Sequence, residues 1–196
     1  MQLNEMPPPT TTWIPLSDSR KCNAKWGELM FSLSYLPTAE RLTIVLVKAR
    51  NLKLDIDGKE VQNIFVKVYL INNEKKILKK RTTLKRKDRS PIFNESMIFS
   101  VPPQSLTTVR LRLSVYGVVD NDTHMPIALG HVIAGSCATG KGLRHWHQML
   151  SSLRKPVAMW HVLRQATNQP IFTGGAEAVV AALQHSAQRS KRNSVV

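Results

Sequence analysis

The stretch that decides the fold runs from residue 109 to residue 116 and reads VRLRLSVY. Its apolar residues, Val109, Leu111, Leu113 and Val115, occupy every second position, with arginines, a serine and a tyrosine between them. Successive side chains of a strand point to opposite faces, so this period of two predicts a β-strand with one buried face.

Similar short runs occur on both sides of this stretch, separated by turn signals at intervals of about ten residues. The predicted strands are Glu28–Tyr35, Arg41–Ala49, Ile64–Leu70, the basic stretch Lys75–Lys87, Met97–Val101, Val109–Tyr116, Ala128–Ile133 and Val157–Leu163. One segment differs, because the apolar residues of Leu143–Leu153 fall at helical spacing and predict a short amphipathic helix. The pattern therefore predicts an all-β sandwich or barrel with one helix before the last strand.

The chain of 196 residues is long enough for one domain with tails. Residues 1–26 are rich in Pro, Thr and Ser and are predicted to be a flexible linker. The domain is predicted to cover residues 27–164. The tail, residues 165–196, contains a short Ala/Val-rich segment, Glu177–Leu183, that could form a helix before a basic, disordered end.

Composition excludes several classes of protein. A hydrophobic fraction of 42% does not fit a disordered polycation, and two cysteines, Cys22 and Cys137, cannot build a disulfide framework. No apolar run is long enough to span a membrane, and the start lacks the features of a secretory signal. No phosphate loop, nucleophile elbow or pair of catalytic carboxylates is present, so no enzyme is expected. Few cysteines and no secretory signal lead us to expect a cytoplasmic protein. The net charge of +15 predicts polyanionic partners.

More than half of that charge lies between Lys75 and Arg89, where a net +8 is concentrated. We name eight of these residues the basic strand: Lys75, Lys76, Lys79, Lys80, Arg81, Lys85, Arg86 and Lys87. Strand alternation predicts that Lys75, Lys79 and Arg81 share one face, with Lys76 and Lys80 on the other, where Ile77 would contribute to the core. The predicted role is electrostatic binding of anionic lipid or acidic proteins. The alternative is an edge strand that its lysines protect against aggregation.

Four stretches in order resemble the second C2 domain (C2B) of the synaptotagmins. They are residues 27–35 (GELMFSLSY), 41–52 (RLTIVLVKARNL), 79–85 (KKRTTLK) followed by 93–95 (FNE), and 145–163 (HWHQMLSSLRKPVAMWHVL). Within the family, YLPTAERLT, MIFSVP and RKPVAMWH resemble the calcium-insensitive branch. The resemblance implies an eight-stranded Greek-key β-sandwich with a helix inserted before the last strand, and no catalysis.

The resemblance also implies a place in vesicle trafficking and exocytosis. The implied partners are phosphoinositide and phosphatidylserine membranes, SNARE proteins, a clathrin adaptor and other C2 domains. The protein would lie peripherally at a vesicle or the plasma membrane, and the parent protein could carry a membrane anchor. In relatives, the bottom loop (Arg154 and Lys155) and the closing motif (Trp160, His161 and Leu163) also bind partners. The alternatives are an ordinary exposed loop and an aromatic residue that belongs to the core.

Calcium binding in the family depends on several carboxylates that converge from two loops, since the ion takes about 6–8 oxygen ligands. In the first loop, the family's Ser-Asp-Pro-Tyr appears here as QNIF, so that a carboxylate is replaced by the neutral Asn63. Asp55 or Asp57 could still take the place of the first aspartate.

The third loop departs further. Gly117 and Val119 stand where the first two aspartates are expected, and Ile127 stands near the third. Asp120 and Asp122 are present but displaced. We therefore expect no calcium cofactor and no other metal, because the remaining carboxylates do not converge. The alternative is a calcium-dependent phospholipid binder with a degenerate site.

Three further hypotheses concern partners. The last residues, Ser194 to Val196, fit the carboxyl-terminal pattern that PDZ domains bind as an added strand. A nucleic-acid-binding β domain could use the same positive charge, but the basic strand has no interleaved aromatic residues for base stacking. A protein-binding adaptor is the third possibility, and nucleic acid is not the expected partner.

Overall fold

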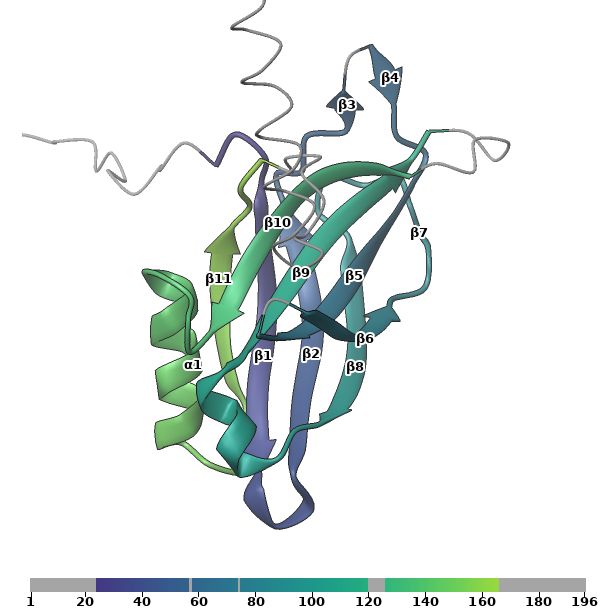
Figure 1. The fold of residues 1–196 in the computed structure, drawn as a ribbon. Coiled ribbons are helices and arrows are strands. Elements are labelled where there is room, and N and C mark those ends of the chain that lie inside the picture. The colour runs from purple at the N-terminus through teal and green to yellow at the C-terminus, as the bar shows by residue number, and fades with distance from the viewer. Residues whose placement is uncertain (1–23, 57, 74, 120–125, 166–196) are drawn as a thin grey trace, which may run out of the picture.

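The computed structural model describes residues 24–56, 58–73, 75–119 and 126–165. They form two antiparallel sheets packed face to face (Figure 1). The first sheet has the order β11 (Val157–Val162), β1 (Glu28–Leu36), β2 (Arg41–Arg50) and β8 (Ile92–Ser100). The second has the order β10 (Ile127–Gly135), β9 (Val109–Val118), β5 (Asn63–Asn72) and β6 (Lys75–Arg81), with β7 (Lys85–Arg86) paired to β5. A small hairpin of β3 (Asp55–Ile56) and β4 (Lys59–Glu60) extends from one end.

The predicted sandwich is confirmed, with each of the eight predicted strands present. The basic stretch Lys75–Lys87 is not one regular strand, however, because strand geometry is interrupted at residues 82–84, between β6 and β7. Thr82 causes the break: it is buried, its amide donates to the Val66 carbonyl (2.9 Å), and its Oγ1 accepts from the Val66 amide (3.0 Å). Both β6 and β7 pair with β5, so the basic stretch follows one edge of the second sheet and is interrupted at residues 82–84.

The core lies between the sheets and follows the predicted alternation. Leu111, Leu113 and Val115 of β9 are fully buried, as are the alternate residues Leu29, Phe31 and Leu33 of β1. Burying such side chains stabilises the fold by about 1.5–3 kcal/mol each.

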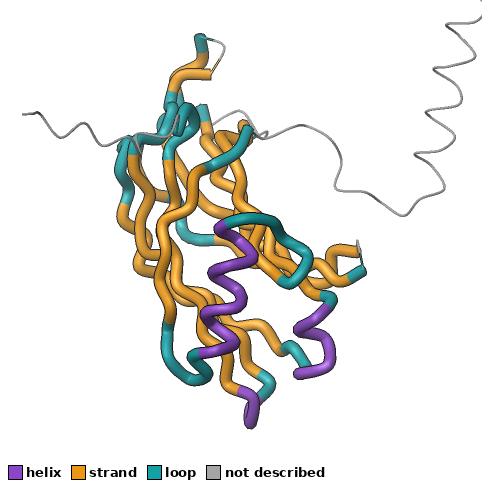
Figure 2. The backbone as a smooth tube through the Cα atoms, turned by 90° about the vertical axis from the view of Figure 1, so that its left-hand side faces the viewer, coloured by secondary structure: helices purple, strands orange, loops and turns teal. Residues whose placement is uncertain are grey.

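The predicted helix is present as α1 (Lys141–Ser151), beginning and ending two residues earlier than expected. It runs beside the strands at the edge formed by β10 and β11 (Figures 1 and 2). Its buried face includes Trp146 and Met149, and its first turn lies so close to β10 that a Cβ on Gly142 would stand 2.1 Å from the Ile133 carbonyl oxygen. The helix therefore seals one open side of the sandwich.

Within the described ranges, no helix is both long and apolar enough to cross a membrane. The predicted linker up to residue 23, the tail from residue 166, Cys22 and the carboxyl-terminal PDZ pattern lie outside the described residues.

Candidate functional site

Strand β6 forms an edge of the second sheet, and every one of its residues is exposed. The prediction that Ile77 contributes to the core is wrong, because 53% of this residue is exposed. A β-bulge is the cause: Leu70 pairs with Leu78 and Ile71 pairs with Lys76, which leaves Ile77 without a partner on β5.

The bulge also changes which cations share a face. Lys79 and Arg81 pair with Tyr69 and Lys67, the residues of β5 that point away from the core. Beyond the bulge, Lys76 rather than Lys75 falls on this side, because it pairs with Ile71. The predicted grouping of Lys75 with Lys79 and Arg81 is therefore wrong, since an extra residue in a strand shifts the alternation by one.

We name the outward-facing group of Lys67, Lys76, Lys79 and Arg81 the cationic face. Lys67 was missed from the sequence, because it lies in a buried strand and outside the run of basic residues. The sequence did offer one signal: Lys67 stands between Val66 and Val68, which point into the core, so strand alternation directs Lys67 outward. Burial, and then the charges of Lys79, Arg81 and Lys76, lower the pKa of Lys67. Lys67 is thus repelled by the charges of the other three cations, and a bound anion would relieve this repulsion.

Aromatic rings form the floor beneath these cations. Phe65 and Tyr116 stack with their centroids 5.5 Å apart, and the Lys67 Nζ lies 4.5 Å from the Tyr116 ring centroid. The Lys76 Nζ lies 5.0 Å from the Tyr69 ring centroid. Burial, with a hydrogen bond to Tyr116, raises the pKa of Tyr69, so that its phenol stays neutral. Cation–π contacts of this kind hold the ammonium groups above a rigid surface.

The remaining residues of the basic strand are placed elsewhere. Lys80 points to the other side of the sheet, with its Nζ 5.4 Å from the Phe99 ring centroid. Lys85 lies 3.8 Å from Glu95 in an ion pair, and Lys87 is paired with Glu60. Lys75 is exposed but lies off the cationic face, because it pairs with Asn72. Arg86 of β7 pairs with Asn63 of β5, so it faces the same side of the sheet as the cationic face, at the other end of β5.

Two of the remaining predicted sites lie in the bottom loop and the closing motif. Arg154 and Lys155 are exposed, and the Arg154 amide donates to the Tyr35 carbonyl (3.0 Å). Trp160 is not a core residue, so that alternative is wrong: it lies half-buried on the outer face of the first sheet, with the Arg50 guanidinium 4.2 Å from its ring centroid. Strand β11 is at the opposite side of the sandwich from β6, so this motif and the cationic face are separate surfaces.

The other members of the closing motif, His161 and Leu163, are buried. His161 belongs to a histidine pair: its Nε2 lies 2.8 Å from His145 Nδ1, and His145 Nε2 lies 2.8 Å from the Val157 carbonyl oxygen. A carbonyl only accepts, so His145 Nε2–H donates to it and His161 Nε2–H donates to His145 Nδ1. Burial lowers the pKa of both residues, that of His161 to about 3, so the pair is neutral and joins α1 to β11.

Those loop residues considered for calcium that the structure describes do not form a carboxylate cluster. Asp55 is exposed in β3, Asn63 begins β5, and Val119 is half-buried just after β9. Gly117 is buried, and a Cβ there would stand 2.5 Å from a methyl carbon of Val61. Side chain volume therefore fills the position where the family pattern would place an aspartate.

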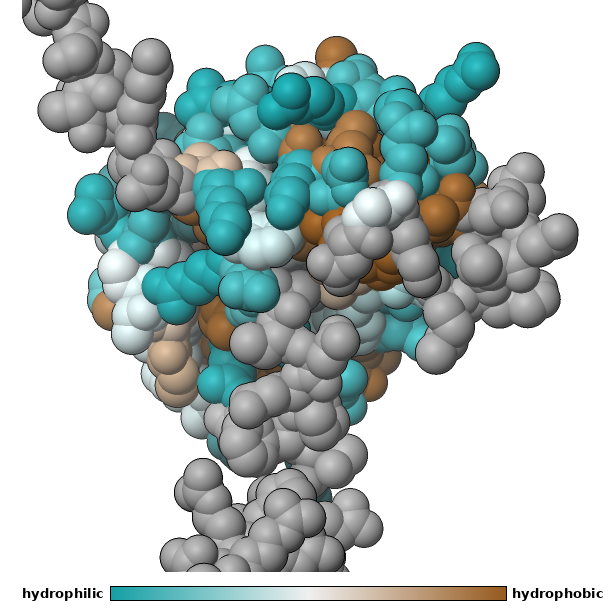
Figure 3. Space-filling view, turned by 90° about the horizontal axis from the view of Figure 1, so that it is seen from above, coloured by the Kyte–Doolittle hydropathy of each residue, from teal (hydrophilic) through white to brown (hydrophobic). Residues whose placement is uncertain are grey.

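Asp57, Asp120 and Asp122 lie outside the described residues. Among the residues that the structure describes, no three His, Cys, Asp or Glu side chains are grouped closely enough to hold a metal ion. The nearby Glu60 is engaged by Lys87, whose hydrogen bond and charge lower the pKa of that carboxyl. Seen from the end of the sandwich where β3 and β4 lie, the described surface is mostly hydrophilic, with some apolar side chains among the polar ones (Figure 3).

Comparison with known proteins identifies the family to which the chain belongs. The C2 domain family matches residues 40–149. Synaptotagmin-12 of Homo sapiens is 48% identical over 162 residues, which cover 80% of this chain and 37% of that protein. Synaptotagmin-5 of Homo sapiens is 39% identical over 160 residues, covering 80% of this chain and 40% of that protein. The chain thus spans well under half the length of these relatives.

Solved structures agree on the fold. The third C2 domain of KIAA1228 protein superposes with a TM-score of 0.58 at 17% identity, covering 80% of this chain and all of that one. A C2 domain of RIM2 gives a TM-score of 0.51 at 19% identity, over 70% of this chain and 97% of that one. At these identities the likeness shows the sandwich fold alone. Together with the match to the family itself, it shows that the chain belongs to the C2 domain family and is a relative of the synaptotagmins.

Proposed function

We propose that this protein is a calcium-independent C2 module that binds anionic phospholipid in vesicle trafficking and exocytosis. The observation that carries the proposal is the cationic face: Lys67, Lys76, Lys79 and Arg81 on one side of one sheet edge, above stacked aromatic rings. None of the four forms an ion pair with a described carboxylate, so their charge is available to phosphate groups.

The magnitude of this charge is sufficient for attachment to a membrane. Each basic residue near an anionic membrane contributes about 1 kcal/mol, so four contribute about 4 kcal/mol, or roughly a thousandfold in partitioning. Exposed charges are screened by salt, so the binding should weaken as ionic strength rises. Phosphoinositide and phosphatidylserine are the proposed lipids, because both present anionic headgroups to such a face.

Calcium independence is proposed from the packing at the loop end. Gly117 has no space for a side chain, because Val61 fills it. We expect that Gly117→Asp alone does not confer calcium binding, and that space must first be made with Val61→Ala. Isothermal titration with calcium measures this, and binding by the unmodified protein at micromolar calcium would contradict the proposal.

Protein partners are proposed for the same surface and for the closing motif. Acidic segments of SNARE proteins and of a clathrin adaptor would use the cationic face through the chemistry that attracts phosphates. The alternative, a nucleic-acid-binding domain, has less support: Phe65 and Tyr69 are more than nine-tenths buried, so their faces are not open to bases.

Co-sedimentation with vesicles tests the proposal. Binding should require phosphoinositide or phosphatidylserine, stay the same with a calcium chelator, and fall with added salt. Competition with single-stranded nucleic acid at physiological salt separates the alternatives. Displacement by nucleic acid at concentrations equal to those of lipid phosphate would favour the nucleic-acid function.

A further inference from the structure

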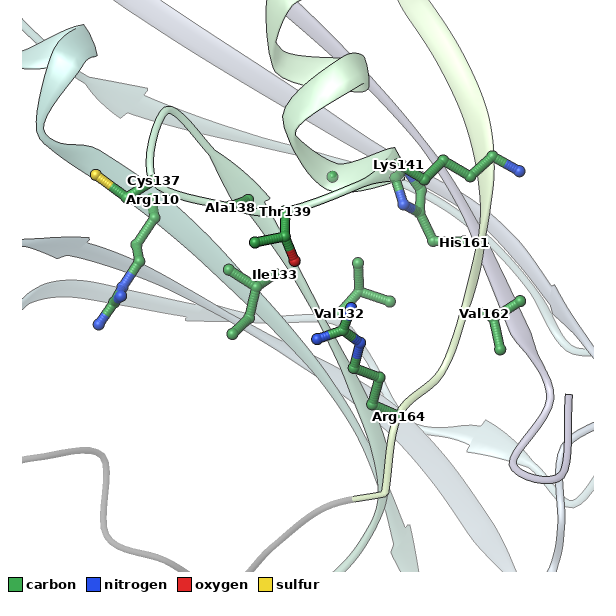
Figure 4. Close-up of a pocket in the computed structure, with 11 residues that line it drawn as sticks. Arg110, Val132, Ile133, Cys137, Ala138, Thr139, Lys141, His161, Val162 and Arg164 are labelled. Atoms are coloured by element: carbon green, nitrogen blue, oxygen red, sulfur yellow. The ribbon is translucent and has the colours of Figure 1, made fainter.

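A cavity of about 370 Å³ lies where the two sheets part, on the side of the sandwich opposite the basic strand. Strands β10 and β11 form its walls, and the start of α1 covers one end (Figure 4). Pockets that bind small molecules have volumes of about 300–1,000 Å³, whereas one water molecule occupies about 30 Å³. The cavity therefore has room for a small organic molecule and not only for an ion.

The charges that line the cavity all have one sign. Arg110 comes from β9, Lys141 is the first residue of α1, and Arg164 follows β11, while none of the lining residues is acidic. In Figure 4 the guanidinium of Arg164 and the hydroxyl of Thr139 point toward the middle of the lining residues, while Arg110 and Lys141 lie at its two ends. These groups are donors, so they favour an anionic ligand with several acceptor oxygens.

The start of helix α1 adds to this preference. Lys141 and Gly142 line the cavity, and Gly140 at the N-cap supplies no side-chain hydrogen bond. The first amides of the helix thus lack the partner that a capping residue would give them, and the positive end of the helix dipole lies at the cavity. The helix end is only one contributor, since the cationic side chains come from other elements as well.

The walls are fixed in place before any ligand binds. Arg164 is held on β10 by two backbone hydrogen bonds with His131, both 2.9 Å long. His161, whose ring forms part of the wall, is held by its bond to His145. Gly142 is packed on the Ile133 carbonyl. A preformed site loses little free energy in ordering its groups when the ligand binds.

We propose that this cavity binds a soluble phosphate monoester, with the phosphate near Arg164, Thr139 and the start of α1. The apolar residues Val132 and Val162 would contact the organic part of the ligand. A lipid headgroup carries the same chemistry, but the cavity is separate from the cationic face, which is the proposed membrane surface. The site would therefore bind its ligand independently of lipid.

Cys137 offers a readout at one end of the cavity, beside Arg110, because it lines the cavity and its thiol is exposed. With Cys22→Ser, Cys137 is the only thiol of the chain, which has 2 cysteines. We expect saturating glycerol 3-phosphate to slow the alkylation of Cys137 by neutral iodoacetamide at least fivefold. Amide NMR shifts at Lys141 and Gly142 should titrate with the same affinity.

The variants separate this site from the membrane surface. K141Q/R164Q should need at least tenfold more glycerol 3-phosphate for the same protection of Cys137. Thermal unfolding of this variant shows whether the fold is kept. The matched variant K79Q/R81Q removes the same charge from the cationic face and should leave the protection unchanged. Protection by phosphoinositide vesicles without protection by the soluble monoester would overturn the proposal. So would equal effects of the two variants, or an absence of both protection and amide shifts.

Discussion

Acidification should destabilise the domain through the buried histidine pair. In the folded protein burial lowers the pKa of His161 to about 3, while an unfolded histidine keeps the ordinary value of 6.5. Between these values the unfolded state binds one more proton than the folded state, so stability falls as pH falls. From about pH 7.5 to about pH 5.5 this costs about 1.4 kcal/mol for His161. The pKa of His145 is lowered as well, so His145 adds to the loss.

Urea unfolding followed by tryptophan fluorescence at several pH values measures this change. His161→Gln keeps a donor toward His145 but cannot titrate, so the loss between the two pH values should shrink by about 1.4 kcal/mol. The exposed His147 on the same helix provides the matched control, and His147→Gln should leave the pH profile as it is. If His161→Gln and the unmodified protein lose the same stability on acidification, the pair does not carry the pH dependence and the reasoning is wrong.

Two further predictions concern packing, and both are measured as free energies of unfolding. Gly142→Ala should destabilise the domain by about 2 kcal/mol or more, because its Cβ would stand 2.1 Å from the Ile133 carbonyl oxygen; the exposed Gln148→Ala is the control, and equal effects would contradict the close approach. Tyr35→Phe should cost about 1–2 kcal/mol, because the buried hydroxyl donates to the Val101 carbonyl over 2.8 Å; an unchanged stability would show that this bond contributes nothing.

The sequence was sufficient for the fold, because the period of two in β9 and its neighbours follows directly from which side chains must be buried. The same rule failed at β6. There the bulge at Ile77 reverses the alternation. The sequence of an exposed, lysine-rich edge strand contains no residue that indicates where such a bulge lies. Lys67 was missed for a related reason: it joins the cationic face through pairing between strands, and pairing register is a long-range property. Trp160 could not be assigned either, since an aromatic residue suits both faces of a sheet.

The central claim is that lipid binds the cationic face, and vesicle co-sedimentation of two triple variants in calcium chelator tests it most directly. K76Q/K79Q/R81Q removes three charges from that face, while K75Q/K80Q/K85Q removes three charges that lie off it. At about 1 kcal/mol per cation, the first variant should bind phosphoinositide vesicles about a hundredfold more weakly, and the second should lose less than about tenfold. Equal losses in the two variants would show that only total charge matters and would contradict the account. Binding of the unmodified protein that appears only when calcium is restored would contradict it equally.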